Sequence, residues 1–420
     1  MDIKKSLQAV EQNRDFLIDT LRRMVAVDTT NPPGLNYDKL ADVTEPILKS
    51  FGFKTKRVVV PFERLSVIKL PLKGDRVNLV ASKESGKPTV SIYAHMDVVP
   101  VEGKWTHNPF GGEIIDGKIY GRGTLDMKGE AAAMLTALKV MNDLEIPPVF
   151  DMNVLFCTDE EVGTYPGVYY LAQEGYVKGH LMWLETGSQE PVQTGSSAGC
   201  LDTEIFVTGK SAHSGRNWNG VNALEESIPI LEELYALKQQ IQSRKSKDKV
   251  RPEGKGMVPL IPLYNIDIIK SGVKSNIVPD SCYIVTNRRY LPEEKYEDVL
   301  KEIEDAIARG KKRSKALDVR FEHRLLYKPV VIDTNNKYAV GARKVRSMVH
   351  GWKEEDYVVV GSTGSIDMGF ALDVPGIQGV ASFGSRRTHN GTGHGVDEYC
   401  DINELVNLAK ECLLYLSLPE

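Results

Sequence analysis

The sequence contains few cysteines, and none of them forms a C-x-x-C pair. The five are Cys157, Cys200, Cys282, Cys400 and Cys412, an odd number scattered through a chain of 420 residues. This pattern argues against a disulfide framework and against a cysteine-bound zinc, and it indicates reduced thiols. We therefore expect a protein of a reducing, cytoplasmic compartment.

The sequence also lacks a long apolar run and an excess of positive charge. No apolar run approaches the ~20 residues that cross a membrane, and residues 1–16 are too polar for a signal peptide. The formal net charge is -4, and no basic block is long enough to bind nucleic acid strongly. We expect a soluble protein that binds neither a membrane nor nucleic acid, and that is long enough for two domains.

Strands and helices alternate in the first part of the chain. Predicted helices cover residues 5–28, 37–51, 127–144 and 166–174, and predicted strands cover 53–60, 64–70, 77–82, 88–95, 151–157 and 180–184. The alternation predicts an α/β layer with helices on both faces of a mostly parallel sheet. Ligands of such sheets bind at the carboxyl ends of the strands.

The pattern changes at about residue 199. Strand, helix, two strands, helix and strand follow one another up to about residue 325, which is the ferredoxin-like order. The α/β pattern then resumes with helix 335–349, strands 356–360 and 376–381, and helix 401–416. We therefore predict a discontinuous domain of residues 1–198 and 326–420, interrupted by an inserted α+β domain of residues 199–325.

Polar residues at the predicted strand ends suggest a metal site. His95 ends an apolar run, and Asp97 two residues later lies on the same side, where it could orient the imidazole. Asp126 follows a glycine-rich stretch, and the adjacent Glu160 and Glu161 end another strand, an arrangement that a cation or a shared proton would compensate. Taken alone, His95 would more often make a core or surface hydrogen bond than bind a metal.

Nine short motifs, in order along nearly the whole chain, resemble one family of dinuclear zinc hydrolases. They are HMDVVP, W-x-x-NPFGG, GKIYGRGTLDMKG, TDEEVG, WLE, GKSAHSG, GVNALE, NIVP and HGVDEY. The family contains acetylornithine deacetylase, succinyl-diaminopimelate desuccinylase, aminoacylase and glutamate-releasing carboxypeptidases. The resemblance implies a zinc-exopeptidase-like catalytic domain, with the inserted domain as a lid or dimerisation domain.

The resemblance also implies a set of metal ligands. One zinc would be held by His95 and Glu185, the other by Glu161 and His394, with Asp126 as the bridge between them. Glu160 would be the general base, Asp97 would support His95, and the Asp126–Met127 peptide bond would be cis. Cobalt or manganese could substitute for the two zinc ions, because carboxylate-rich sites accept several metals. The metals would acidify a shared water and polarise the scissile carbonyl.

Residues of the inserted domain would complete the site. The resemblance implies that His213 stabilises the oxyanion from the partner subunit of a homodimer; the alternative is an ordinary turn histidine. Asn276 and Arg289 would hold the substrate α-carboxylate, and Thr363 and Gly364 would line the same pocket. For Arg386 and His389, pocket-lining and surface roles stay open. Arg288, next to Arg289, would face the other way.

The leading functional hypothesis is hydrolysis of the amide bond of an N-acyl amino acid, as in acetylornithine deacetylase or succinyl-diaminopimelate desuccinylase. A dipeptidase or carboxypeptidase of the same family is the alternative, because pocket shape distinguishes these members. A non-hydrolytic binding protein on this scaffold would lack Glu160 or a ligand, yet all are present. A dinuclear phosphoesterase would need more histidine ligands and basic residues.

Overall fold

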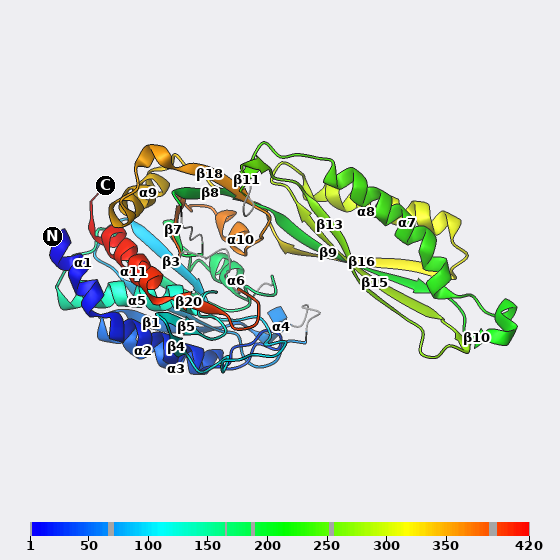
Figure 1. Cartoon of the computed structure of the whole chain (residues 1–420), viewed down its shortest axis with the longest axis horizontal. Coiled ribbons are helices and arrows are strands. Elements are labelled where there is room, and N and C mark those ends of the chain that lie inside the picture. The colour runs from blue at the N-terminus through cyan, green and yellow to red at the C-terminus, as the bar shows by residue number, and fades with distance from the viewer. Residues whose placement is uncertain are drawn as a thin grey trace. The chain divides into compact units, whose positions relative to one another are not determined.

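The computed structural model describes residues 2–65, 71–163, 166–185, 190–251, 256–385 and 393–419 (Figure 1). The chain forms two compact units. Unit 1 comprises Met1–Thr194, Ile332–Val359 and Phe370–Glu420, and unit 2 comprises Gly195–Val331 and Val360–Gly369. The predicted insertion of residues 199–325 lies inside unit 2, which also takes up residues 360–369. The lid or dimerisation role of this unit stays a prediction.

Unit 1 is built on a mostly parallel six-stranded sheet, as predicted. Its strand order is β1 (Lys54–Val59), β2 (Val77–Lys83), β6 (Asp151–Cys157), β3 (Thr89–His95), β7 (His180–Trp183) and β19 (Val380–Ser382). Strands β6, β3, β7 and β19 are parallel, whereas β2 runs antiparallel to β6 and β1 antiparallel to β2. The central strands are almost wholly apolar and buried, as expected of a covered parallel sheet.

Helices cover the sheet of unit 1. They are α1 (Ile3–Gln12), α2 (Arg14–Val25), α3 (Tyr37–Ser50), α4 (Phe62–Leu65), α5 (Lys128–Asp143), α6 (Val168–Gln173), α9 (Lys337–His350), α10 (Met368–Leu372, which extends from unit 2 into unit 1) and α11 (Ile402–Ser417), with the 3₁₀ turn η2 (Glu354–Asp356). Helix α5, rich in alanine, leucine and methionine, is buried along nearly its whole length against α2, α11 and β3. This packing fixes Asp126, which lies just before the helix.

Two predicted elements differ in the structure. Residues 5–28 do not form one helix, because Asn13 leaves helical geometry and its side-chain amide donates to the carbonyl of Ala9, so that α1 ends and α2 begins there. The predicted strand 64–70 begins in the short helix α4, and its residues 66–70 lie outside the described part.

A small antiparallel sheet joins two loops of unit 1 that are distant in sequence. Strand β5 (Lys118–Tyr120) pairs with β4 (Glu113–Ile115) on one side and with β20 (Tyr399–Asp401) on the other. The loop that leads from β5 to Asp126 therefore lies beside the segment that follows His394.

Unit 2 has the predicted βαββαβ order. Its antiparallel sheet has the order β13 (Leu263–Ser271), β15 (Ser281–Tyr290), β9 (Gly199–Thr208) and β16 (Asp318–Tyr327), and helices α7 (Ala223–Gln242) and α8 (Tyr296–Arg313) bury an apolar core against it. The remaining pieces are β10 (Ala212–His213), η1 (Ser214–Asn219), β11 (Lys249–Val250), β12 (Val258–Pro259), β14 (Ile277–Val278) and β17 (Val330–Val331). Strands β8 (Val192–Ser197) and β18 (Val358–Ser362) carry the chain across the boundary between the units. None of the helices in the described residues is long and apolar enough to span a membrane.

Candidate metal centre and active site

His95 lies at the carboxyl end of the central strand β3 and is fully buried. Its Nδ1 lies 3.1 Å from the backbone carbonyl of Asp97, to which it can only donate a hydrogen bond, and Nε2 therefore faces the neighbouring carboxylates. That Nε2 lies 3.2 Å from Asp126 Oδ1 and 3.7 Å from Glu185 Oε1. The orientation of the ring is therefore the one that a metal ligand needs.

Asp126 stands between two histidines. Its Oδ1 faces His95, whereas its Oδ2 lies 3.4 Å from His394 Nε2. His394 Nε2 also lies 3.1 Å from Glu161 Oε2. The Asp126–Met127 peptide bond is cis, as the resemblance implied. The aspartate thus presents one oxygen to each of two groups of side chains, as a bridging ligand would.

These side chains form two groups that could each hold a metal ion. His95, Asp126 and Glu185 form one, and Asp126, Glu161 and His394 form the other, with the ligand atoms of each group within 4.8 Å of one another. Among the described residues, the buried Glu161 Oε1 has no hydrogen-bond partner. A buried carboxylate oxygen without a donor is costly, and a cation would compensate it. The imidazole and carboxylate donors therefore fit divalent ions such as zinc.

The crowding of acidic and basic groups shifts their pKa values. The carboxylates of Asp126 and Glu161, which accept hydrogen bonds from the protonated ring, raise the pKa of His394 to about 10. Burial raises the pKa of Glu161 to about 7, and His394 opposes this shift. Burial acts to lower the pKa of His95, but the surrounding carboxylates of Asp126, Asp97 and Glu185 outweigh it and raise that pKa well above its usual value.

Asp97 supports both the metal group and the base candidate. Its Oδ1 accepts a hydrogen bond from the backbone N–H of Glu160 at 3.1 Å, and its Oδ2 accepts one from that of Glu161 at 3.0 Å. The same Oδ1 lies 3.5 Å from His95 Nδ1. Glu160 is buried, precedes Glu161 directly in the chain, and belongs to neither of the two groups found among the described residues.

A further buried network behind Asp97 was missed by the sequence analysis. The Asn31 side-chain amide donates to both Asp97 and Asp159 at 3.0 Å, and the Arg76 guanidinium bonds Asp159 at 3.3 Å and the Pro33 carbonyl at 2.8 Å. Burial raises the pKa of Asp159 to about 6, although Arg76 opposes the shift. The motifs NPPG and TDEEVG contain Asn31 and Asp159. Their contact across the fold, however, leaves no local pattern.

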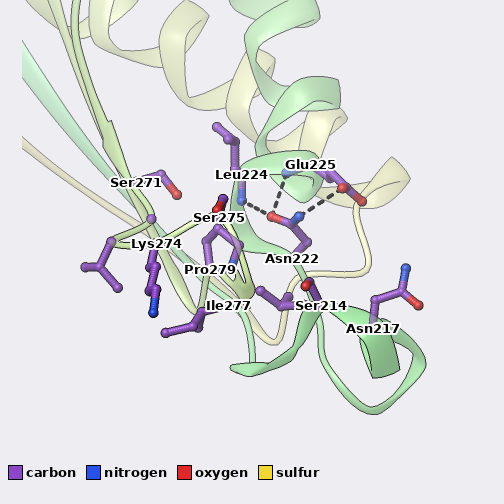
Figure 2. Close-up of a pocket in the computed structure, with 13 residues that line it drawn as sticks. Ser214, Asn217, Asn222, Leu224, Glu225, Ser271, Lys274, Ser275, Ile277 and Pro279 are labelled. Carbon is purple, nitrogen blue, oxygen red and sulfur yellow. Dashed lines mark hydrogen bonds between the residues drawn. The ribbon is translucent and has the colours of Figure 1, made fainter.

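His213 and Asn276 lie close together in unit 2. Strand β10, which ends at His213, pairs with β14, and the Ser214 N–H donates to the carbonyl of Asn276 at 3.0 Å. His213 is exposed, and its Nδ1 accepts the Gly215 N–H at 3.0 Å, which leaves Nε2 open. A hollow of about 620 Å³ in this part of the unit is lined by residues of η1, the start of α7 and the segments 271–275 and 277–279. Figure 2 shows these lining residues.

Arg289, Thr363 and Gly364 gather at the opposite end of the same unit. Arg289 lies opposite Cys200 on strand β9, and the loop that carries Thr363 and Gly364 is fastened to Ala198 through bonds from Ala198 N to Ser362 O and from Ser365 Oγ to Ala198 O. Arg289 is eight positions after Ser281 in strand β15, and at about 3.3 Å per residue this is roughly 26 Å. Within one copy, Asn276 and Arg289 therefore lie at opposite ends of the sheet.

The remaining candidates have structural partners or lie outside the described residues. Arg288 is buried and bonds Glu294 at 2.6 Å on the covered face, opposite to Arg289. His107 bonds Glu113, His180 accepts from Tyr415, His323 bonds Tyr296 and His350 bonds Glu411, all away from the two metal groups. Arg386 and His389 lie outside the described residues, so their roles stay open.

Comparisons with known proteins identify relatives over most of the chain. The Peptidase family M20/M25/M40 matches residues 91–416. Acetylornithine deacetylase of Proteus mirabilis is 26% identical over 301 residues, which cover 70% of this chain and 72% of the relative. A probable succinyl-diaminopimelate desuccinylase of Staphylococcus aureus is 27% identical over 353 residues, covering 79% and 84%. The solved structure of the di-peptidase Dug1p from Saccharomyces cerevisiae has a TM-score of 0.79 at 17% identity and covers 100% of this chain and 99% of that one, which supports the fold.

Proposed function

The chain belongs to Peptidase family M20/M25/M40, a family of metal-dependent amide hydrolases, and on that premise we propose that it hydrolyses an N-acyl amino acid, as acetylornithine deacetylase and succinyl-diaminopimelate desuccinylase do. The observation that carries the proposal is the pair of groups of potential metal ligands that share Asp126; the buried Glu160 directly precedes Glu161, a member of one of them. Hydrolysis of an amide by two metal ions needs a bridging carboxylate and a separate base, and Asp126 and Glu160 are our candidates for these two roles.

Two zinc ions per chain are the proposed cofactors, with cobalt or manganese as substitutes. His95 and Glu185 would hold one ion and Glu161 and His394 the other, with Asp126 between them. When bound, such ions acidify a shared water and polarise the scissile carbonyl. The support for this assignment is the donor set itself and the unpartnered oxygen of Glu161 among the described residues.

Glu160 is the proposed general base. Its backbone N–H is fixed by Asp97, which also holds the N–H of the ligand Glu161, so one carboxylate sets the positions of the base and of a ligand. The Glu160 carboxylate takes a proton from the attacking water and passes it to the leaving amine. Asp97 acts through His95, Glu160 and Glu161 and is a positioning residue.

We propose that the substrate site is shared between two copies of the chain. One copy would bind the α-carboxylate of the substrate through Arg289, Thr363 and Gly364, because the Arg289 guanidinium lies near the loop that carries Thr363 and Gly364. Asn276, with His213 close to it, precedes the start of strand β15, whereas Arg289 lies near the end of that strand, roughly 26 Å from Ser281, so one small substrate would not span both places. A homodimer in which the second copy supplies His213 as oxyanion donor and Asn276 as a carboxylate ligand resolves this separation.

Unit 2 has a surface that suits the second copy. Strand β13 is an edge of the sheet and carries the exposed Ile268 and Ile269. Helix α7 packs against it and exposes Leu224, Ile228 and Tyr235 along one side. An unpaired edge strand next to an apolar helix stripe favours strand pairing and helix packing between two copies.

A dipeptidase or carboxypeptidase activity is the alternative. Its support is the similarity in fold to the di-peptidase Dug1p over the whole chain. A role in cytoplasmic amino-acid metabolism accords with five buried cysteines, all of them free thiols.

A hydrolysis screen tests the proposal. Purified protein with added zinc or cobalt would be assayed by amine release from N-acetyl amino acids, N-succinyl amino acids and dipeptides. We expect turnover of an N-acyl amino acid that disappears on chelation and returns with metal. Turnover of dipeptides alone would establish the alternative, and no metal-dependent turnover of any of them would refute both.

A further inference from the structure

A buried ion pair, Arg122–Glu398, connects the loop that ends at Asp126 with the segment that follows His394. The side chains of Arg122 and Glu398 are 2% and 1% exposed, and Arg122 Nη1 donates to Glu398 Oε2 at 2.5 Å. Arg122 follows strand β5, and Glu398 directly precedes β20, which pairs with β5. The pair therefore lies where the two loops are already held side by side, as Figure 1 shows for the two strands.

The Glu398 carboxylate organises the loop before Asp126. Its Oε1 accepts the backbone N–H groups of Gly123 and Leu125, both at 3.0 Å. The Gly121 N–H also donates to the backbone carbonyl of Glu398 at 2.8 Å. Gly123 has a φ of +86°, and a Cβ there would lie 2.7 Å from Val98, so the loop can wrap around the carboxylate only with glycine at this position.

The second amino group of Arg122 reaches the other ligand. Arg122 Nη2 donates to the backbone carbonyl of His394 at 3.2 Å and to that of Pro100 at 3.3 Å. His394 sits on a loop with a φ of +64°, and its side chain is 53% exposed, so packing constrains it little. The planar guanidinium thus joins Glu398 and His394 through its two amino groups.

From these contacts we propose that Arg122 and Glu398 are positioning residues that set the distance between Asp126 and His394, and with it the affinity of the metal held by Glu161 and His394. This inference rests on the proposed two-metal function. The other metal group depends less on the pair, because His95 is held by the Asp97 carbonyl and Glu185 by the Trp183 indole. Residues that orient metal ligands commonly change metal affinity by roughly 10–100-fold when replaced.

Two variants separate the two contacts of the pair. Arg122→Lys keeps a positive charge beside Glu398, but its single ammonium cannot reach Glu398 and the His394 carbonyl in the same planar geometry. Glu398→Gln removes the charge and turns an amide N–H toward Arg122, which also loosens the Asp126 loop. The matched control is Glu411→Gln, which alters a buried carboxylate of the same unit that bonds His350 instead.

Stepwise zinc binding to the metal-free proteins would be measured by competition with a chromophoric chelator. Anomalous scattering from crystals of the zinc-loaded proteins would then give the zinc occupancy of each position. We expect Arg122→Lys to lower only the affinity for the ion held by Glu161 and His394, by roughly 10–100-fold. We expect Glu398→Gln to weaken the binding of both ions, and to weaken that of the Glu161–His394 ion more. We expect Glu411→Gln to leave the affinity for both ions unchanged.

The inference is overturned if Arg122→Lys binds both ions as tightly as the unaltered protein does. It is also overturned if this variant loses affinity for both ions equally and unfolds at a lower temperature, because the pair would then have a structural role only. Failure of the unaltered protein to bind two ions would instead refute the proposed function.

Discussion

Replacement of Asp97 by asparagine tests how the proposed metal ligands and the proposed base are held. Asp97 Oδ1 faces Glu160 N–H and His95 Nδ1, and its Oδ2 accepts from Glu161 N–H and Asn31. Asparagine keeps one oxygen and presents an NH₂ in place of the other. If the oxygen of the asparagine still accepts from Glu161 and Asn31, its NH₂ group faces the Glu160 N–H and His95 Nδ1. Both of these are donors, so the hydrogen bond from the Glu160 N–H is lost.

The magnitude follows from that lost bond. A hydrogen bond to a charged group contributes about 1.5–3 kcal/mol. This equals roughly a 10–100-fold change in a binding constant, which agrees with the usual effect of removing a carboxylate behind a metal-bound histidine. The metal-free protein should lose less, because Asp97 also helps to raise the pKa of Asp159, and its removal relieves that repulsion.

Zinc affinity and turnover are the assays for Asp97→Asn. We expect weaker zinc binding and slower turnover, with little change in the unfolding temperature of the metal-free protein. The control is Asp151→Asn, because Asp151 also accepts two backbone N–H groups, those of Ser85 and Lys87, at the opposite end of the central strands. Zinc affinity like that of the unaltered protein in Asp97→Asn would refute the reasoning.

Three further predictions concern pH, subunit exchange and metal binding. Burial lowers the pKa of His180 to about 3, whereas the pKa in the unfolded chain is about 6.5, so the stability that the neutral ring contributes is complete above pH 6.5 and is lost as the pH falls toward 3. The thermal unfolding temperature of His180→Leu should therefore depend less on pH between 6.5 and 4 than that of the unaltered protein. An equally steep decline in the variant would contradict this role of His180. Glu160→Gln and His213→Ala should each be inactive alone but regain about a quarter of the activity when mixed and allowed to exchange subunits, since half of the dimers are then mixed and have one complete site; a mixture without activity argues against the shared site. Because the pKa of His394 is raised to about 10 without a metal, zinc binding at pH 8 should release protons, so that calorimetric heats differ between buffers of different ionisation enthalpy; equal heats would refute that protonation state.

Much of the fold follows from local sequence patterns. The apolar runs that end at His95 and Glu185 predicted strands with ligands at their carboxyl ends, and the strand–helix order of residues 199–325 predicted the βαββαβ unit. These features depend on the spacing of apolar residues within short segments, which the sequence displays directly. The Asn13 break was missed because it depends on a single side-chain bond to Ala9.

The support behind the site could not be predicted in the same way. Arg122 and Glu398 are 276 positions apart, and Arg76 and Asp159 are 83 apart, so no local period links them. The converse holds in unit 2, where Asn276 and Arg289 are near in sequence but lie toward opposite ends of an extended strand. Contacts of this kind are set by the packing of elements and become visible only in three dimensions.

The most direct test of the two-metal hydrolase is the Glu160→Ala variant, measured for zinc content and for turnover of the best substrate from the screen. Glu160 belongs to neither metal group, so the account predicts that two zinc ions per chain remain bound while turnover is abolished. Retained turnover with both ions bound would contradict the assignment of Glu160 as the base.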